Sequence, residues 1–95
     1  MFDLEDKYII FLKEVISKYL DNFDLYLYGS RAKGCARKYS DIDIALSSEQ
    51  LTPEIKSKIE FELEDSTLPY KVDLIDLNDI TDKFKNLIKE TMLKL

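Results

Sequence analysis

The sequence predicts an α+β fold, an α/β sandwich in which a small mixed three-stranded sheet is covered by helices. Segments with apolar residues at steps of three and four, typical of amphipathic helices, alternate with short segments rich in Leu, Ile, Val and Tyr, typical of strands. Their order is α-β-α-β-α-β-α. The chain has 95 residues, 45% of them apolar, with two Gly and two Pro, so we expect one globular domain spanning residues 1–95.

The first part of the chain is expected to form a helix, a strand and a short helix. Apolar residues recur at helical spacing over residues 4–19, and Asp3 is in position to act as the N-cap. Residues 25–28 are predicted as a short strand closed by a turn, and residues 31–36 as a short helix.

The remaining elements follow from alternation and from helix-start signals. Strict alternation over residues 41–46 predicts a second strand. Thr52, followed by a proline, marks the N-terminus of a helix, and residues 70–77 are predicted as a third strand. Asn78 or Asp79 is expected to cap a final helix, whose apolar positions are Ile80, Phe84, Leu87, Ile88, Thr91 and Leu95.

The lengths of the connections predict how the strands pair. About a dozen residues separate the first two strands, which is short for a parallel crossover, so we expect an antiparallel pair. More than about 20 residues, including a full helix, separate the second and third strands, which favours a right-handed parallel crossover.

Missing residue types exclude several kinds of chemistry. The chain contains no His, which excludes Ser-His-Asp triads and His-ligated zinc, and its only Cys, Cys35, can form no internal disulfide. Catalysis would therefore depend on carboxylates, Lys, Arg, Tyr, hydroxyls or a metal held by oxygen atoms.

The charge is unevenly distributed along the chain. The formal net charge is −5, which argues against general nucleic-acid binding. Residues 29–40 hold four basic and no acidic residues, a local charge of +4, against ten basic and 19 acidic residues, or −9, elsewhere. A small basic patch on an acidic body suits a compact anion such as a nucleoside triphosphate, although a solvated basic loop would look the same.

Neither a membrane segment nor a secretory signal is expected. The longest apolar run is five residues, against the roughly 20 that a membrane helix needs. The N-terminus is acidic and lacks the basic-then-apolar order of a signal peptide, so we expect a cytoplasmic protein.

Three acidic residues on predicted strands indicate a metal site. Asp41 and Asp43 share one strand face, where they repel each other unless a cation lies between them. Asp73 interrupts the apolar third strand and would lie beside them if the two strands pair. Three converging carboxylates form an all-oxygen site suited to Mg²⁺, while Asp76 faces the other way and is expected to be exposed or to cap the next helix.

The dipeptide Gly29-Ser30 follows the first predicted strand. Glycine lets the backbone approach a ligand closely, and a serine hydroxyl can contact a phosphate oxygen. By itself such a pair is usually a plain turn. Its distance of ten intervening residues from Asp41-x-Asp43, with a later strand that carries another Asp, is a stronger signal.

These residues carry a family resemblance. The chain resembles the minimal nucleotidyltransferases of the DNA polymerase β-type superfamily in two strings, GSRAKGCA followed by SDIDIA at residues 29–45, and VDLIDL at residues 72–77. The resemblance implies the nucleotidyltransferase fold and an Mg²⁺-dependent enzyme that transfers a nucleoside monophosphate, expected to be AMP from ATP, to an acceptor.

The resemblance also assigns roles to six residues. It implies that Asp41 and Asp43 are metal ligands for two Mg²⁺ ions and that Asp73 is the third carboxylate, which makes these three the catalytic residues. It places Gly29 and Ser30 in the turn that holds the triphosphate.

Arg31 occupies the basic position that usually follows the Gly-Ser pair in this family. The resemblance implies a nucleotide-binding residue there, in contact either with the phosphate or with a partner.

A protein partner is expected because only about 18 residues follow the third strand, enough for one helix. Larger members of the superfamily complete the cleft with a further domain. In the minimal branch the resemblance implies a small helical HEPN-type partner, in a toxin–antitoxin-like pair, that carries the acceptor hydroxyl. Homo- or hetero-oligomers are both compatible with this, and the residues that would either dock the partner or complete the core are Ile9, Ile10, Phe61, Met92 and Leu93.

Two other functions remain open from the sequence. The chain could be a catalytically silent nucleotide-binding antitoxin or regulatory subunit that neutralises a helical partner, or an acidic structural domain without a ligand. The intact carboxylates favour the enzyme, because a pure binding module has no need to keep three mutually repelling acids together.

Overall fold

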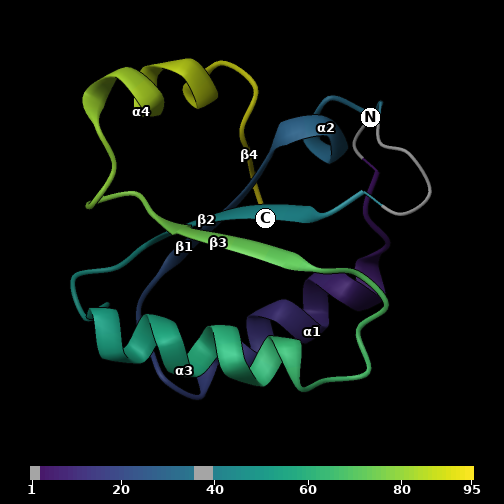
Figure 1. The fold of residues 1–95 in the computed structure, drawn as a ribbon, viewed down its shortest axis with the longest axis vertical. Coiled ribbons are helices and arrows are strands. Elements are labelled where there is room, and N and C mark those ends of the chain that lie inside the picture. Colours follow the sequence, from purple (N-terminus) through teal and green to yellow (C-terminus); the bar gives the residue numbers. More distant parts are fainter. Residues whose placement is uncertain (1–2, 36–39) are drawn as a thin grey trace.

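A four-stranded mixed sheet separates two layers of helices in the computed structural model, which describes residues 3–35 and 40–95 (Figure 1). In chain order the elements are α1 (Asp6–Ser17), β1 (Asp24–Tyr28), α2 (Gly29–Ala32), β2 (Ile42–Ser47), α3 (Pro53–Glu64), β3 (Val72–Asp76), α4 (Asp82–Lys89) and β4 (Leu93–Lys94).

The sheet has the strand order β3-β2-β1-β4. β1 and β2 are antiparallel, and β2 and β3 are parallel with α3 as the crossover, so both predicted pairings are confirmed. The α/β sandwich predicted from the sequence is confirmed as well.

The prediction of three strands is wrong, because a short fourth strand closes the other edge. Here Leu93 pairs with Leu27 and Lys94 with Tyr26, antiparallel to β1, and the amide of Leu95 donates to the carbonyl of Leu25 at 2.8 Å. The predicted final helix ends at Lys89, well before Leu95. A two-residue strand has no detectable periodicity, and its apolar residues continue the helical spacing, so the sequence pattern extended the helix through it.

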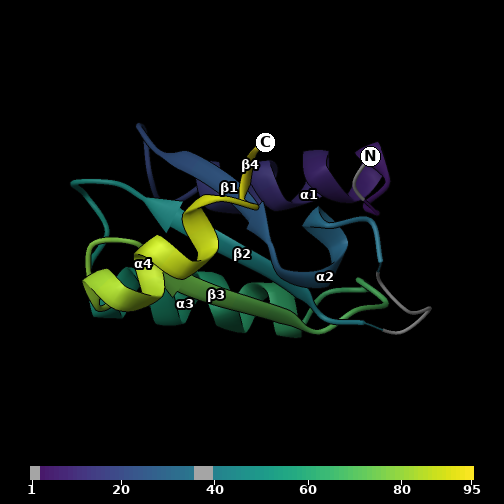
Figure 2. The ribbon, with the colours of Figure 1, turned by 90° about the horizontal axis from the view of Figure 1, so that it is seen from above.

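The two faces of the sheet are covered unequally. α1 and α3 lie together on one face and bury the main core, which takes most of its apolar side chains from these helices and from Leu25, Leu27, Ile42, Ile44, Leu46 and Leu74 of the sheet. On the other face α4 and α2 lie over opposite ends of the strands (Figure 2). A smaller cluster forms there, whose buried members are Tyr28, Ala45, Leu77 and Ile88.

Helix starts follow local capping chemistry, in part as predicted. Thr52 caps α3 as expected, since its Oγ1 accepts from the amide of Ile55 at 3.2 Å. α4 is capped by Thr81 and not by Asn78 or Asp79, because residues 76–79 form a turn in which the amide of Asp79 donates to the carbonyl of Asp76.

The two predictions for the starts of α1 and α2 are also corrected. Glu5 precedes α1, whereas the amide of the predicted cap Asp3 donates to the carbonyl of Arg31 at 2.8 Å. The short helix α2 begins directly after β1, at Gly29, and ends at Ala32.

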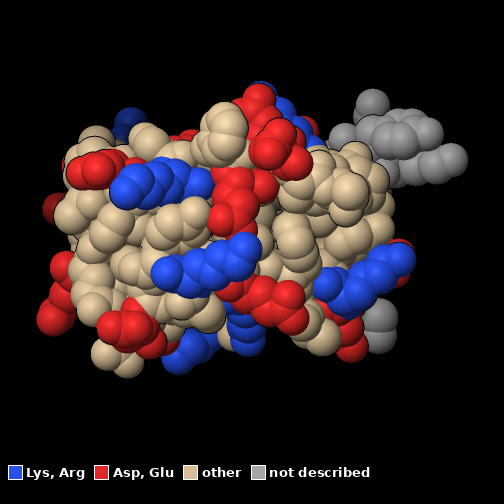
Figure 3. Space-filling view, turned by 90° about the horizontal axis from the view of Figure 1, so that it is seen from below, with Lys and Arg blue, Asp and Glu red and all other residues tan. Residues whose placement is uncertain are grey.

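The outer face of the α1–α3 layer carries both signs of charge. Figure 3 shows acidic and basic side chains interspersed across it, with no large region of one sign. One pair joins the two helices, with Lys18 Nζ 2.6 Å from Glu62 Oε2. Among the described residues, no helix combines the length and apolar character required to cross a bilayer.

The apolar residues considered for partner docking divide into two groups. Ile10 is 56% exposed, Phe61 69% and Leu93 38%. Ile9 and Met92 instead pack against the two core clusters. Ile10, Phe61 and Leu93 lie on α1, α3 and β4. Contact with a partner remains a prediction for these three residues only.

We expect Thr81→Ala to lower the free energy of unfolding by about 1 kcal/mol, because the Thr81 Oγ1 accepts from the amide of Phe84 at 3.2 Å and the substitution leaves that amide without its cap. Urea denaturation measures the change. Thr67→Ala is the matched control, since Thr67 is exposed in the loop after α3, and it should change stability by less than about 0.5 kcal/mol. Equal losses for the two variants would contradict the capping role.

Candidate active site

Asp43 and Asp73 lie side by side on adjacent strands. The parallel register of β2 and β3 pairs Asp43 directly with Asp73, and neighbouring strands are about 4.8 Å apart. Both residues lie on the face that carries Ala45 and Ile75 of the smaller apolar cluster. The position of Asp73 beside Asp43, predicted if the two strands paired, is therefore confirmed by the strand register.

The turn after β1 lies directly against Asp43. Tyr28 pairs with Asp43 across the β1–β2 ladder, and Gly29 follows with a positive φ of 75°. A Cβ atom at Gly29 would overlap Asp43 Oδ2. Glycine thus suits the backbone conformation of this turn and leaves room for the Asp43 carboxylate in its present position.

Electrostatic repulsion is concentrated at Asp43. Burial raises the pKa of the half-buried Asp43 carboxyl, and the nearby charges of Asp73 and Asp41 raise it further, while the Arg31 guanidinium partly opposes them. Such a group is stabilised by a cation close to it, because a cation offsets both the lost hydration and the repulsion.

Tyr28 belongs to the same environment. Burial, followed by the charges of Asp73 and Asp43, raises the pKa of its phenol to about 12, so the hydroxyl stays protonated near neutral pH. Its ring packs edge-on against Phe84 of α4, with ring centroids 6.3 Å apart. Tyr26 and Tyr28 alternate along β1 with Leu25 and Leu27, and the structure places the two leucines in the main core and the two tyrosines in the smaller cluster on the opposite face.

Asp41 lies just outside the predicted strand. β2 begins at Ile42, and Asp41 precedes it as an exposed residue, so the predicted strand 41–46 is shifted by one residue. As the side chains lie, no three acidic or Cys side chains within residues 3–35 and 40–95 form a group ready to hold a metal ion. The sheet pairs Asp43 with Asp73, while Asp41 lies outside β2 and does not form a group of three with them, so the predicted convergence of three carboxylates is not present in this arrangement of side chains.

Asp76 closes the turn after β3. It is half-buried, and its Oδ1 accepts from the amide of Asn78 at 2.9 Å. It therefore caps a turn, so neither predicted placement, exposed or capping the following helix, is correct.

The basic segment divides between buried and exposed residues. Arg31 is 6% exposed, and Lys33 is exposed at the end of α2. Ser30 is half-buried in α2, where its carbonyl accepts from the amide of Cys35 at 3.0 Å. Arg37 and Lys38, which complete the predicted patch, lie outside the described residues.

The Arg31 guanidinium is turned toward backbone carbonyls. Nε and Nη2 donate to the carbonyl of Ser40 at 3.2 and 2.8 Å, and Nη1 donates to the carbonyl of Asp3 at 2.8 Å. The guanidinium carbon lies 4.2 Å from the centre of the Tyr70 ring. Tyr70 was not singled out from the sequence, where an aromatic residue at the start of a strand carries no functional signal.

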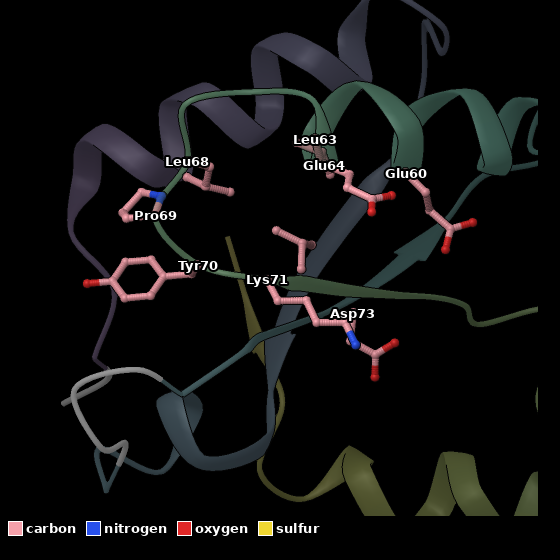
Figure 4. A pocket seen from close by; sticks show the side chains of 9 residues that line it. Glu60, Leu63, Glu64, Leu68, Pro69, Tyr70, Lys71 and Asp73 are labelled. Atoms are coloured by element: carbon pink, nitrogen blue, oxygen red, sulfur yellow. The ribbon is translucent and has the colours of Figure 1, made fainter.

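A groove runs along the outer edge of β3, next to Asp73 (Figure 4). Its volume is about 460 Å³. Glu60 and Glu64 of α3 line one wall, and Tyr70 and Asp73 lie toward opposite ends of the groove. The rest of the lining is formed by Leu63, Leu68, Pro69, Lys71 and Val72. The groove lies at the free edge of β3, and β2 separates β3 from β1, the strand that ends at the Gly29 turn.

Comparisons with known proteins give a consistent result. The family described as "Polymerase beta, Nucleotidyltransferase" matches residues 11–93. The chain is 29% identical over 89 residues to a protein of Haemophilus influenzae named "Probable protein adenylyltransferase MntA", a match that covers 93% of this chain and 78% of that protein.

Solved structures show the same fold. A crystal structure of a toxin–antitoxin with AMP-PNP superposes with a TM-score of 0.76 at 25% identity, over 96% of this chain and 72% of that one. A crystal structure from Shewanella oneidensis superposes with a TM-score of 0.68 at 26% identity, over 96% of this chain and 71% of that one.

We expect Gly29→Ala to destabilise the protein by about 1 kcal/mol more than Gly34→Ala, as measured by urea denaturation. Both glycines have a positive φ, 75° and 74°, so both substitutions carry a similar backbone strain. Only the Gly29 variant also displaces the end of the Asp43 side chain, and because that end can rotate we place the added cost at about 1 kcal/mol, the low end of the range for overpacking. Equal losses would show that the Gly29–Asp43 contact is not energetically important.

Proposed function

This chain belongs to the polymerase β-type nucleotidyltransferase family, and from that premise we propose that it transfers AMP from ATP to a hydroxyl group of a partner protein. The observation that carries the proposal is the parallel register that places Asp43 beside Asp73, next to the turn at Gly29. A sheet that holds two like charges in adjacent positions, one of them half-buried, gains nothing in stability from them, so a ligand is the simplest reason for the arrangement.

The donor set suits magnesium. Carboxylate oxygens are hard ligands of the kind that Mg²⁺ selects, and the burial and repulsion that raise the pKa of Asp43 are the conditions that a bound cation would relieve. We propose Asp41, Asp43 and Asp73 as the residues that hold two Mg²⁺ ions. When bound, these ions would neutralise charge on the phosphates and on the leaving group.

Other residues of the chain would bind the nucleotide and accept the proton of the acceptor. The Gly29-Ser30 turn lets the triphosphate approach the backbone closely, with the Ser30 hydroxyl facing a phosphate oxygen. The acceptor oxygen attacks the α-phosphorus, the bond from this phosphorus to the β-phosphate oxygen breaks, and pyrophosphate leaves. Asp73 takes the acceptor proton, since the chain has no His to act as base and Asp73 lies beside the groove from which an acceptor can enter.

A toxin is the acceptor that we propose. The similar Haemophilus influenzae protein is named as a protein adenylyltransferase, and the toxin–antitoxin structure similar to this chain was crystallised with AMP-PNP. Together with the resemblance seen in the sequence, this supports a small helical HEPN-type partner in a toxin–antitoxin pair. We expect the reaction to take place in the cytoplasm, where ATP is supplied.

A second candidate function is a silent antitoxin that binds nucleotide and partner without turnover. A toxin–antitoxin relative is compatible with either function. The paired carboxylates favour the enzyme, and transfer of labelled AMP distinguishes the two.

We expect Asp43→Asn to reduce AMP transfer by about 100-fold or more, because the variant loses a carboxylate at the reacting phosphate. The measurement is incorporation of label from α-labelled ATP into the HEPN-type partner in the presence of Mg²⁺. The complex with the partner should remain intact, and stability should not fall, since one of two repelling charges is removed.

Asp76→Asn is the matched control for this experiment. Asp76 also lies on β3, and an amide oxygen can keep its hydrogen bond to Asn78, so transfer should stay near the wild-type level. Undiminished transfer by Asp43→Asn would refute the assigned site. A stable complex without transfer by the wild-type protein would favour the silent antitoxin.

Chelation should stop transfer without unfolding the protein. The carboxylates lie outside the main apolar core, which is formed on the opposite face of the sheet. We therefore expect EDTA to leave the circular dichroism spectrum and the cooperative thermal transition in place while transfer falls to background, with full recovery on adding Mg²⁺. Loss of the folded signal in EDTA would mean that the metal has a structural role.

A further inference from the structure

The Arg31 side chain connects segments that are far apart in the sequence. Its guanidinium donates to the carbonyls of Ser40 and Asp3 and lies 4.2 Å from the ring centre of Tyr70. The side chain is 6% exposed. Arg31, in α2, therefore contacts three other segments: the one before β2 through Ser40, the one before β3 through Tyr70, and the N-terminal segment through Asp3.

The connected segments are those that carry the candidate site. Ser40 immediately precedes Asp41, and Tyr70 precedes Asp73 by three residues. The first rung of the β2–β3 ladder is the hydrogen bond from the amide of Ile42 to the carbonyl of Lys71, at 2.8 Å. Arg31 thus holds the two strands together just outside the first rung, at the end where the carboxylates lie.

The contacts use the shape of arginine and not only its charge. Two N–H groups of the planar fork reach the same carbonyl of Ser40, a third reaches the carbonyl of Asp3, and the guanidinium carbon lies over the Tyr70 ring. A lysine ammonium has neither the fork nor the plane. Tyr70 is itself packed edge-on against Tyr8 of α1, with ring centroids 5.5 Å apart, so the main core supports this contact.

The surroundings of Arg31 do not suit a phosphate contact. The hollow beside it has a volume of about 330 Å³ and is lined by Asp3, Leu4, Glu5, Tyr8 and Tyr70. Two of these residues are acidic, and none of them belongs to the Gly29 turn or to the carboxylate pair. A phosphate in this hollow would meet negative charge, and a contact with nucleotide elsewhere would require Arg31 to leave its carbonyl partners.

We infer that Arg31 is a positioning residue, which sets the spacing of the carboxylate-bearing segments 40–43 and 70–73 relative to the Gly29 turn and does not contact the nucleotide. The effect of this positioning on AMP transfer rests on the proposed function. Its structural part, the coupling of Arg31 through Tyr70 and Ser40 to the positions of Asp43 and Asp73, can be tested without turnover.

The first test uses the protein without metal or nucleotide. Amide chemical shifts are measured by NMR for the wild type, Arg31→Lys, Tyr70→Leu and the matched control Tyr70→Phe, which keeps the ring. We expect Arg31→Lys and Tyr70→Leu to move the same amide signals, those of residues 40–43 and 71–73, and Tyr70→Phe to leave them unchanged. Shifts confined to the immediate neighbours of each substituted residue, or equal effects of Tyr70→Phe and Tyr70→Leu, would overturn the inference.

The second test separates positioning from phosphate contact by steady-state kinetics of AMP transfer. A misplacement of about 1 Å can cost about 100-fold in rate, so we expect kcat to fall by about 10- to 100-fold in Arg31→Lys and in Tyr70→Leu. KM for ATP should change by less than about threefold. The double variant should be no slower than the slower single variant, because both substitutions break one connection.

The outcomes of the two tests can be told apart. A tenfold or larger rise in KM for ATP in Arg31→Lys with kcat unchanged would show a phosphate contact and overturn the inference, as would a fully active Tyr70→Leu variant. A wild-type protein that transfers no AMP would contradict the proposed function, and the amide shifts of the metal-free variants would still decide whether Arg31 positions the two segments.

Discussion

The parallel pairing of β2 and β3 is the constraint on which the rest of the site depends. It places Asp43 opposite Asp73, and the antiparallel pairing with β1 brings the Gly29 turn against the same carboxylate. The arrangement is unfavourable by itself, since burial and neighbouring charge both raise the pKa of Asp43. It persists because the opposite sides of the same strands are anchored in apolar contacts, where Ile42 and Ile44 are 0% exposed.

The two faces of the sheet have different roles: one carries the main apolar core, and the other carries the candidate site. The α1–α3 face holds the larger cluster of apolar side chains, while the face of the carboxylates is covered at its two ends by the short helices α4 and α2. Site residues therefore come from strand positions that alternate with core positions. A substitution on the site face can change the chemistry with little effect on the core beneath it, which is why the fold can carry repelling acids.

Local patterns predicted much of this correctly. The alternation around Asp43, the crossover length and the Thr52 cap each depend on residues close in sequence, and each is confirmed. The predictions that were wrong concern elements whose positions depend on contacts with residues elsewhere in the chain. β4 exists because two residues near the C-terminus satisfy the free edge of β1, and Thr81 replaces Asn78 or Asp79 as cap because Asp76 closes a turn first. Arg31 could be recognised as a basic residue after Gly-Ser, but its carbonyl partners and Tyr70 lie in segments whose approach no local pattern encodes.

The amino-acid order alone determined which residue types could take part in chemistry, that the acids alternate with core residues, and that glycine and serine follow the first strand. Those properties are local, because side-chain direction along a strand depends only on its period of two. Tertiary structure decided which acids meet, which tyrosine joins them, and that the arginine faces backbone carbonyls. These outcomes depend on strand register and on the packing of distant segments, which are set by the burial of the whole core and not by any short stretch of chain.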